Sequence, residues 1–96
     1  VIAPDDELFE KTASNVQAVA ARGGRVVMIT DAPDKAPTLS GDAAKSLKII
    51  RAPACHGFIA PLIYAVPIQL LAYHTAVHKG TDVDQPRNLA KSVTVE

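Results

Sequence analysis

Apolar residues recur at helical spacing near the start of the chain, and they predict a helix from Pro4 to Arg22. The small and apolar positions that share one face of this helix are Leu8, Phe9, Thr12, Ala13, Val16, Val19 and Ala20. Pro4 suits the first turn, where a backbone N–H is not needed, and the acidic run 5–7 favours the positive end of the helix dipole. Gly23 and Gly24 should end the helix, because glycine accepts the left-handed backbone of a helix cap.

A continuous apolar run from Arg25 to Thr30 predicts a strand buried on both faces of a parallel sheet. The opening residues 1–3 have the same character, so we expect the end of a buried strand there and further strands upstream. A weaker run at 47–51 carries charges and predicts an edge strand, while 31–46 and 52–56 are expected to be connections. Strand, helix and strand in this order make a βαβ unit.

The longest apolar stretch, from Gly57 to Lys79, predicts a helix that Gly80 ends and that Pro67 kinks. No Asp, Glu, Lys or Arg lies between Arg51 and Lys79, and about 20 apolar residues are enough to cross a bilayer. The residues that argue against contact with lipid are Pro61, Pro67, Gln69, Tyr73 and His74. We therefore expect no membrane span but a core helix, buried against its sheet and against another domain or subunit.

Composition agrees with part of a small α/β domain. The chain has 96 residues, of which 48% are hydrophobic, as in one globular unit. Two strands and two helices bury little surface, so we expect an open, parallel sheet that is incomplete in this chain. The formal net charge is zero, which argues against binding to nucleic acid or to an anionic membrane. A single cysteine excludes an internal disulfide, in keeping with a cytoplasmic protein.

Three groups of residues outside the C-terminal segment invite a chemical interpretation. Cys55 and His56 are sequence neighbours whose side chains should point apart, so we interpret them as a small buried thiol beside a loop histidine. His74 and His78 share a helix face, but no glutamate follows His74 as in zinc-protease helices, and we predict no metal site. Asp31 follows a strand, where α/β sheets bind ligands, although an exposed loop aspartate is the simpler interpretation.

Residues 81–96 differ from the scaffold and form an irregular tail. Asp82 and Asp84 before Pro86 predict a short turn in which a carboxylate binds free backbone N–H groups. Residues 92–96 alternate polar and β-branched side chains, which favours an extended segment with one docked face. In a dry pocket or beside another cation, Lys91 would lose its proton and could form a Schiff base with a carbonyl substrate. In water it would be an ordinary surface lysine.

The tail and the long helix also resemble a known family. The segments that carry the resemblance are Ala60-Pro61-Leu62-Ile63-Tyr64, Val66-Pro67, Gln69-Leu70-Leu71, Ala72-Tyr73-His74 and the unbroken run from Lys79 through Thr81-Asp82-Val83-Asp84-Gln85-Pro86-Arg87-Asn88-Leu89-Ala90-Lys91 to Glu96. They are similar to the carboxyl terminus of the isomerising glutamine–fructose-6-phosphate aminotransferases, or glucosamine-6-phosphate synthases. A looser similarity covers 4–50, whereas 54–57 departs from the acidic residues expected before the long helix.

The resemblance implies a fold and a division of the chain. Residues 1–80 would be the C-terminal portion of the second sugar-isomerase (SIS) domain, which has a flavodoxin-like, three-layer α/β fold. Residues 81–96 would be a catalytic C-terminal tail. In that tail Lys91 would form the Schiff base with the open-chain sugar, and Arg87, Ala90 and Val93 would line the substrate site and the ammonia channel.

The resemblance also implies a reaction and its partners. The full-length enzyme would convert fructose-6-phosphate and glutamine to glucosamine-6-phosphate and glutamate, using glutamine-derived ammonia from a glutaminase domain. It would be a cytoplasmic homodimer formed through its SIS domains, without a cofactor or a metal. The acid–base and phosphate-binding groups of the family would lie upstream of Val1, so the isolated chain should be inactive. The alternative function is a non-catalytic SIS-type module that binds a phosphosugar or regulates a partner.

Overall fold

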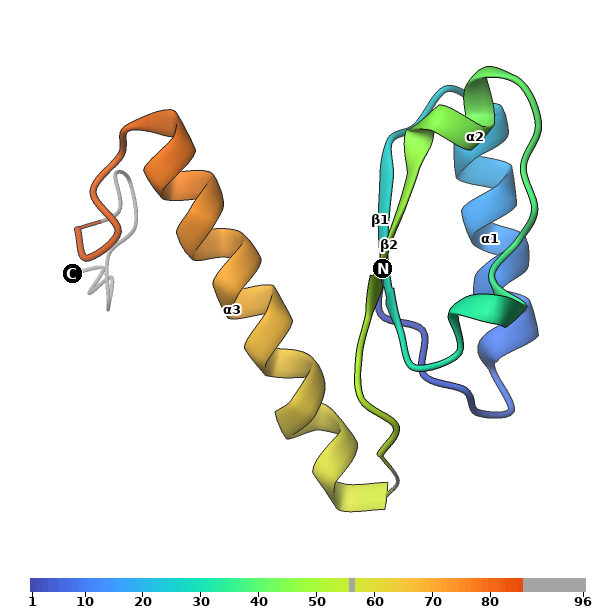
Figure 1. Ribbon diagram of the computed structural model, residues 1–96, viewed down its shortest axis with the longest axis horizontal. Helices are drawn as coiled ribbons and strands as arrows, with labels where there is room; N and C mark the ends of the chain where they lie inside the picture. Colours follow the sequence, from blue (N-terminus) through green and yellow to red (C-terminus); the bar gives the residue numbers. More distant parts are fainter. Residues whose placement is uncertain (56, 86–96) are drawn as a thin grey trace, which may run out of the picture.

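The computed structural model describes residues 1–55 and 57–85. Along the chain lie helix α1 (Phe9–Ala21), strand β1 (Val26–Thr30), helix α2 (Asp42–Ser46), strand β2 (Leu47–Arg51) and helix α3 (Ala60–Lys79) (Figure 1). Two short 3-10 helices, Pro33–Lys35 and Gly57–Ile59, lie within the connections. These elements confirm the predicted order of helix, strand, strand and long helix.

Strand β1 lies at the centre of the sheet that the structure describes. Its five residues pair in parallel with β2, with Ile29 opposite Ile50. On its other side Ile2 forms a parallel bridge with Ile29, and the Ile29 N–H donates to the Val1 carbonyl oxygen at 2.8 Å. The Ala3 N–H donates in turn to the Ile29 carbonyl oxygen at 2.9 Å. The parallel pairing expected at 1–3 is therefore present, but of these residues only Ala3 is buried in this chain, and Val1 and Ile2 are exposed. The edge position expected for β2 is confirmed within the described residues.

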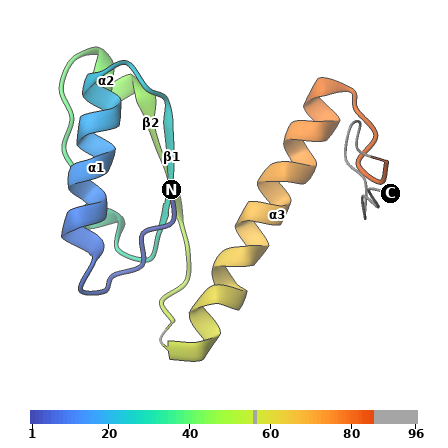
Figure 2. The ribbon, with the colours of Figure 1, turned by 180° about the vertical axis from the view of Figure 1, so that it is seen from behind.

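Apolar residues on the two faces of β1 pack against different helices. On one face Met28 is fully buried with Ala3 and Phe9, the first residue of α1. On the other face Ile29 packs with Ala52 and Tyr64, which lies in the first part of α3. Both ribbon views place α1 and α3 on opposite sides of the strands (Figures 1 and 2). The prediction of a strand buried on both faces is therefore confirmed.

The predicted start of the first helix was wrong. The helix begins at Phe9 and not at Pro4, because residues 5–8 form bends and a turn instead. The side chain of Asp6 accepts a hydrogen bond from the Leu8 N–H at 2.9 Å, and this local bond competes with the helical pattern. Leu8 and Val19 are also exposed, so the buried face is narrower than the spacing predicted.

The connection from Asp31 to Ser46 holds a helix that the sequence did not predict. Helix α2 has five residues and follows Gly41, whose φ of 63° lies in the left-handed region that glycine favours. A helix this short has little more than one turn, so it leaves no periodic pattern to recognise.

Helix α3 ends as predicted, at Gly80 with a left-handed φ of 70°, but it begins at Ala60 and not at Gly57, because Gly57–Ile59 form a 3-10 helix. The expected burial is not found in this chain, since Tyr64 is the one buried residue of α3. The reason is geometric: 20 residues of helix extend about 30 Å, whereas five-residue strands extend about 17 Å. By length and composition alone the segment Gly57–Lys79 could also cross a membrane.

Gly24 is predicted to be the less replaceable of the two glycines after α1. Its N–H donates to the Val19 carbonyl oxygen at 3.0 Å, while the Gly23 N–H donates to Ala20 at 3.0 Å, as in a Schellman cap. A Cβ on Gly24 would lie 2.5 Å from Val19 Cγ1 and 2.9 Å from the Val19 carbonyl oxygen. We expect Gly24→Ala to destabilise the fold by about 1–3 kcal/mol, as measured by chemical denaturation followed by circular dichroism.

Gly23→Ala is the matched control, because its Cβ would meet open space and only the backbone φ of 82° is unfavourable. That control should cost about 1 kcal/mol. Removing the side-chain part of the clash, in a Val19→Ala background, should recover part of the loss. Equal stability of the Gly24→Ala protein and the wild type would contradict the steric account.

Candidate functional site

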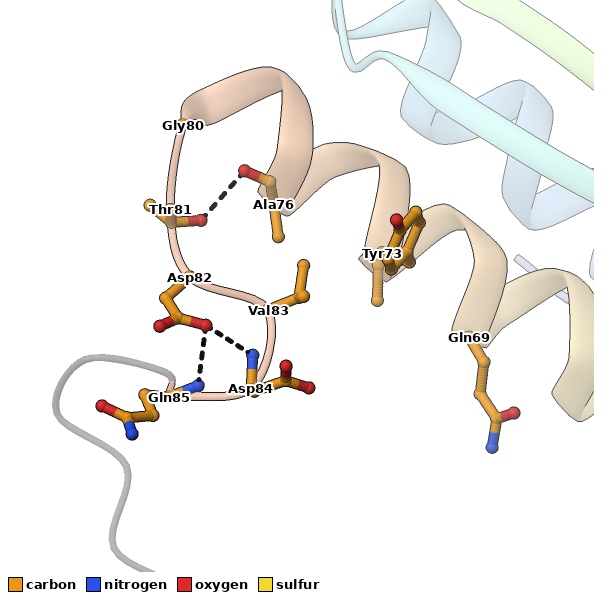
Figure 3. Close-up of a pocket in the computed structure, with 10 residues that line it drawn as sticks. Gln69, Tyr73, Ala76, Gly80, Thr81, Asp82, Val83, Asp84 and Gln85 are labelled. Atoms are coloured by element: carbon orange, nitrogen blue, oxygen red, sulfur yellow. Dashed lines mark hydrogen bonds between the residues drawn. The ribbon is translucent and has the colours of Figure 1, made fainter.

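The C-terminal end of α3 and the segment after it form an open groove of about 830 Å³ (Figure 3). Gly80 turns the chain out of the helix, and the Thr81 N–H and hydroxyl both donate to the Ala76 carbonyl oxygen, at 3.0 and 3.1 Å. These two hydrogen bonds to one carbonyl oxygen hold the segment back along the helix. The groove is lined by Gln69, Ala72, Tyr73, Ala76, Gly80, Thr81, Asp82, Val83, Asp84 and Gln85.

Asp82 holds the turn from which the tail leaves. Its Oδ1 accepts hydrogen bonds from the Asp84 N–H at 2.9 Å and from the Gln85 N–H at 3.3 Å (Figure 3). This arrangement confirms the predicted role of a carboxylate on free backbone donors at the start of the tail. Because the carboxylate accepts from two successive N–H groups, it holds the turn formed by residues 82–85.

The charges along the groove restrict what it can bind. Its charged lining residues within the described chain are the carboxylates Asp82 and Asp84, and neither has a cationic partner there. Carboxylates repel phosphate, so the groove by itself does not suit the anionic end of a sugar phosphate.

The predicted site residues Arg87, Ala90, Lys91 and Val93 all lie outside the described residues. The structure therefore places the base of the tail, up to Gln85, and not the lysine itself. The proposed boundary between residues 1–80 and 81–96 coincides with the end of α3 at Gly80, but nothing in the structure tests it as a boundary of function.

The other candidates have separate locations. Cys55 is free and half-buried against the cluster of Ile29, Ala52 and Tyr64, while His56 lies outside the described residues. His74 packs edge-on against Tyr73, with ring centroids 5.3 Å apart, and both His74 and His78 are exposed. Within residues 1–55 and 57–85, no three metal-ligating side chains gather at one point.

Asp31 is not the exposed loop aspartate that the sequence favoured. It follows β1 and is half-buried, and its Oδ1 accepts hydrogen bonds from the Asp5 N–H at 2.8 Å and from the Tyr64 hydroxyl at 3.2 Å. Asp5 is itself held by Lys35, whose Nζ lies 2.8 Å from both carboxylate oxygens. Asp31 therefore joins the segment before α1, the end of β1 and the start of α3.

The pKa of Tyr64 is raised to about 12, first by burial and then by the negative charge of Asp31. An unfolded tyrosine ionises near pH 10, so the folded chain holds this proton more tightly than the unfolded chain. The resulting stability is complete below about pH 10 and is lost as the pH rises toward about 12. We expect the free energy of unfolding to fall by up to about 3 kcal/mol across this range, measured by denaturation at a series of pH values.

Tyr64→Phe is the control for this alkaline transition. Phenylalanine keeps the ring in the cluster and removes the ionising hydroxyl. The variant should be less stable near neutral pH, where the hydrogen bond to Asp31 is missing, and it should lose less stability between pH 10 and 12. Identical slopes in the two proteins would show that Tyr64 does not cause the transition.

Comparison with known proteins finds relatives of one kind that match the whole chain. No protein-family model matches it. It is 62% identical over 96 residues to the isomerising glutamine–fructose-6-phosphate aminotransferase of Brucella abortus, and 59% identical to that of Bradyrhizobium diazoefficiens. Each match covers 100% of this chain and 15% of the relative, so the chain spans about one-seventh of the length of these proteins.

A solved structure agrees with the sequence matches. The C-terminal domain of glucosamine-fructose-6-phosphate aminotransferase from Francisella tularensis has a TM-score of 0.73 and 41% sequence identity with this chain. The superposition covers 88% of this chain and 22% of that one. The resemblance and the α/β fold expected from the sequence are thus confirmed, and the incomplete sheet agrees with a chain that corresponds to part of that domain.

Proposed function

Because the chain belongs over its whole length to the family of isomerising glutamine–fructose-6-phosphate aminotransferases, we propose that it is the C-terminal part of such an enzyme. In this proposal the full-length protein converts fructose-6-phosphate and glutamine to glucosamine-6-phosphate and glutamate. The observation that carries the proposal is the 62% identity over all 96 residues, which includes the lysine-bearing tail.

Lys91 is the residue that we assign to the chemistry. Open-chain fructose-6-phosphate has a ketone at C2, and the unprotonated Nζ of a lysine attacks such a carbon to give an imine with loss of one water. The positive charge of the protonated imine withdraws electrons from the neighbouring carbon and eases transfer of its proton. An aqueous lysine is protonated at neutral pH, so the surroundings of Lys91 in the full enzyme must lower its pKa.

The groove supports this assignment through position. Residues 80–85 fold back along the end of α3, and Asp82 holds the turn at residues 82–85. Lys91 is the sixth residue after Gln85, so even a fully extended chain would place it no more than about 20 Å away. Arg87, Ala90 and Val93 fall on the same segment, and we assign them to the walls of the sugar site and of the ammonia path.

The remaining parts of the proposal concern the surroundings of the chain. The apolar surface of α3 would be covered by other parts of a cytoplasmic enzyme and would not contact lipid. Glutamine-derived ammonia would come from a glutaminase domain, and the SIS domains would form a homodimer. Residues 1–80 would act as scaffold and residues 81–96 as the catalytic tail.

Borohydride trapping tests the proposal. Borohydride reduces an imine to a stable secondary amine, so the full-length protein incubated with fructose-6-phosphate and borohydride should carry the sugar on Lys91. Peptide mapping by mass spectrometry locates the adduct, and Lys11, on the exposed side of α1, serves as the internal control for non-specific labelling. An adduct on another lysine, with Lys91 unlabelled, would remove Lys91 from the proposed role.

A further inference from the structure

We propose that the outer face of α3 is the docking surface for a second α-helix, which the full-length polypeptide supplies from outside these 96 residues and which lies nearly parallel or antiparallel to α3. The face consists of five side chains, which we call the outer stripe: Leu62, Val66, Leu70, Tyr73 and Val77. The inference rests on the proposed function only for the existence of a longer polypeptide around this chain. It does not depend on the chemistry assigned to Lys91.

The outer stripe faces away from the sheet on which α3 lies. Successive residues of an α-helix are turned by about 100°, so the stripe lies about 160° to 240° around the helix axis from Tyr64. Tyr64 is the buried residue that packs with Ile29 of β1, and it therefore marks the side of α3 that faces the sheet. In Figure 1 the rest of α3 extends away from β1 and β2. Further strands of the same sheet would cover the Tyr64 side, so the outer stripe requires contact with a different layer.

The outer stripe is too apolar for a surface that faces water. Between 52% and 71% of the surface of each of its residues is exposed in this chain. A helix on the outside of a domain normally carries charged and polar residues on the side opposite its core. Here no Asp, Glu, Lys or Arg lies between Arg51 and Lys79. A contiguous apolar patch of this kind marks a contact surface, and without charges of its own it fits an apolar partner.

The spacing of the outer stripe identifies the partner as a helix. Its residues follow one another at intervals of four, four, three and four positions. Side chains at these intervals form a ridge that fits the groove of a second helix crossing at about 20°. Leu62 and Val77 are 15 residues apart, or about 22 Å along the axis. The partner should therefore contribute about four helical turns.

The size of the outer stripe favours a helix of the same polypeptide over a helix of a second copy. Burying a large apolar side chain removes about 100 Å² from water, so five of them supply about 500 Å². A stable complex of two separate proteins buries about 800 Å² on each partner. A covalently linked helix requires less, because the linkage gives it a high effective concentration. The relatives have the necessary length, since this chain spans 15% of each.

Photo-cross-linking in the full-length protein tests the proposal. The photoreactive amino acid p-benzoylphenylalanine replaces Leu62, Val66, Leu70 or Val77, one at a time, and mass spectrometry of the digested protein locates the residue that each captures. We expect captured residues upstream of Val1, which advance along one segment of about 15 residues in steps of three or four. The same amino acid at Lys11, on the exposed side of α1, is the control for non-specific capture.

The other possible occupants are distinct outcomes of this experiment. Protein assembled from isotopically heavy and light subunits separates contacts within one polypeptide from contacts between two, and mixed heavy–light products would overturn the proposal in favour of a second copy. Captured residues at every second position would indicate a strand. Capture of lipid or of residues 81–96 would identify those as the occupant. Each of these results, or cross-linking no stronger than at Lys11, would overturn the proposal.

Substitution at Leu70 gives an independent measurement. Leu70→Asp would place a charge in the helix contact, whereas Leu70→Met keeps an apolar side chain of similar volume. We expect Leu70→Asp to lower the Tm of the full-length protein by at least about 3 °C and Leu70→Met to leave it within about 1 °C. Equal Tm values for Leu70→Asp and the wild type would overturn the proposal. A protein that is never labelled on Lys91 by borohydride would overturn the proposed chemistry and leave the cross-links unchanged, so the two failures are distinguishable.

Discussion

Lys91→Arg should abolish synthesis of glucosamine-6-phosphate by the full-length protein, with a loss of at least about 10³-fold in kcat. Arginine keeps the positive charge and much of the length of lysine. Its guanidinium group stays protonated in proteins, so it has no free amine to attack the sugar ketone. The variant therefore removes the amine needed for an imine and keeps the positive charge. The measurement is the rate of amino-sugar formation at saturating concentrations of both substrates.

Two further measurements make the result specific. Lys11→Arg, the same exchange on the exposed side of α1, should keep activity within about twofold of the wild type. Binding of fructose-6-phosphate by the Lys91→Arg protein should change by only a few-fold, because the phosphate-binding groups are expected elsewhere in the enzyme. Synthesis that survives Lys91→Arg would favour the alternative, a module that binds a phosphosugar without turnover.

The parts of the fold that the sequence predicted are those determined by local patterns. The run from Val26 to Ile29 is continuously apolar because both faces of β1 are covered, and this pattern can be recognised from the local sequence alone. The ends of α1 and α3 were predicted correctly because Gly23 and Gly80 adopt left-handed backbone there. The start of α1 was missed because it depends on one side-chain bond from Asp6.

The parts that were missed depend on contacts between distant segments. Asp31 and Tyr64 are 33 residues apart, so their hydrogen bond has no signature in a local window. A tyrosine within an apolar helix and an aspartate directly after a buried strand were the available signals, because each polar group needs a partner when buried. The exposure of α3 likewise depends on distant elements, because five-residue strands are too short to cover a 20-residue helix, and composition does not give these lengths.

In the candidate site, too, features set by local chemistry were predicted and features set by distant groups were not. A carboxylate turn at Asp82 follows from local chemistry and was predicted, and the structure contains it. Whether Lys91 can act as an amine depends on a pKa that distant groups must set, so physical reasoning on the tail alone favours an ordinary surface lysine. The family similarity, and not periodicity or spacing, assigned the lysine its role.

Phe9→Ala should destabilise the 96-residue chain by about 3–5 kcal/mol, which is a large share of the total stability of a small domain. Phe9 is 4% exposed and packs against Ala3 and Met28, so it joins the start of α1 to the central strand. Alanine would leave a cavity between helix and sheet that the fully buried Met28 cannot fill without moving. Hydrogen exchange of the amides of β1 measures the loss, because these amides exchange only when the sheet opens.

Phe58→Ala is the matched control, since the same side chain is removed from a position that is 99% exposed in this chain. It should change the stability of the 96-residue chain by no more than about 0.5 kcal/mol. Equal losses in the two variants would contradict the assignment of Phe9 to the core. The same pair can be compared in the full-length protein. A large loss of stability for Phe58→Ala there, and not in the 96-residue chain, would show that another segment covers the 3-10 helix just before α3. That result would explain why so apolar a helix has only Tyr64 buried within this chain.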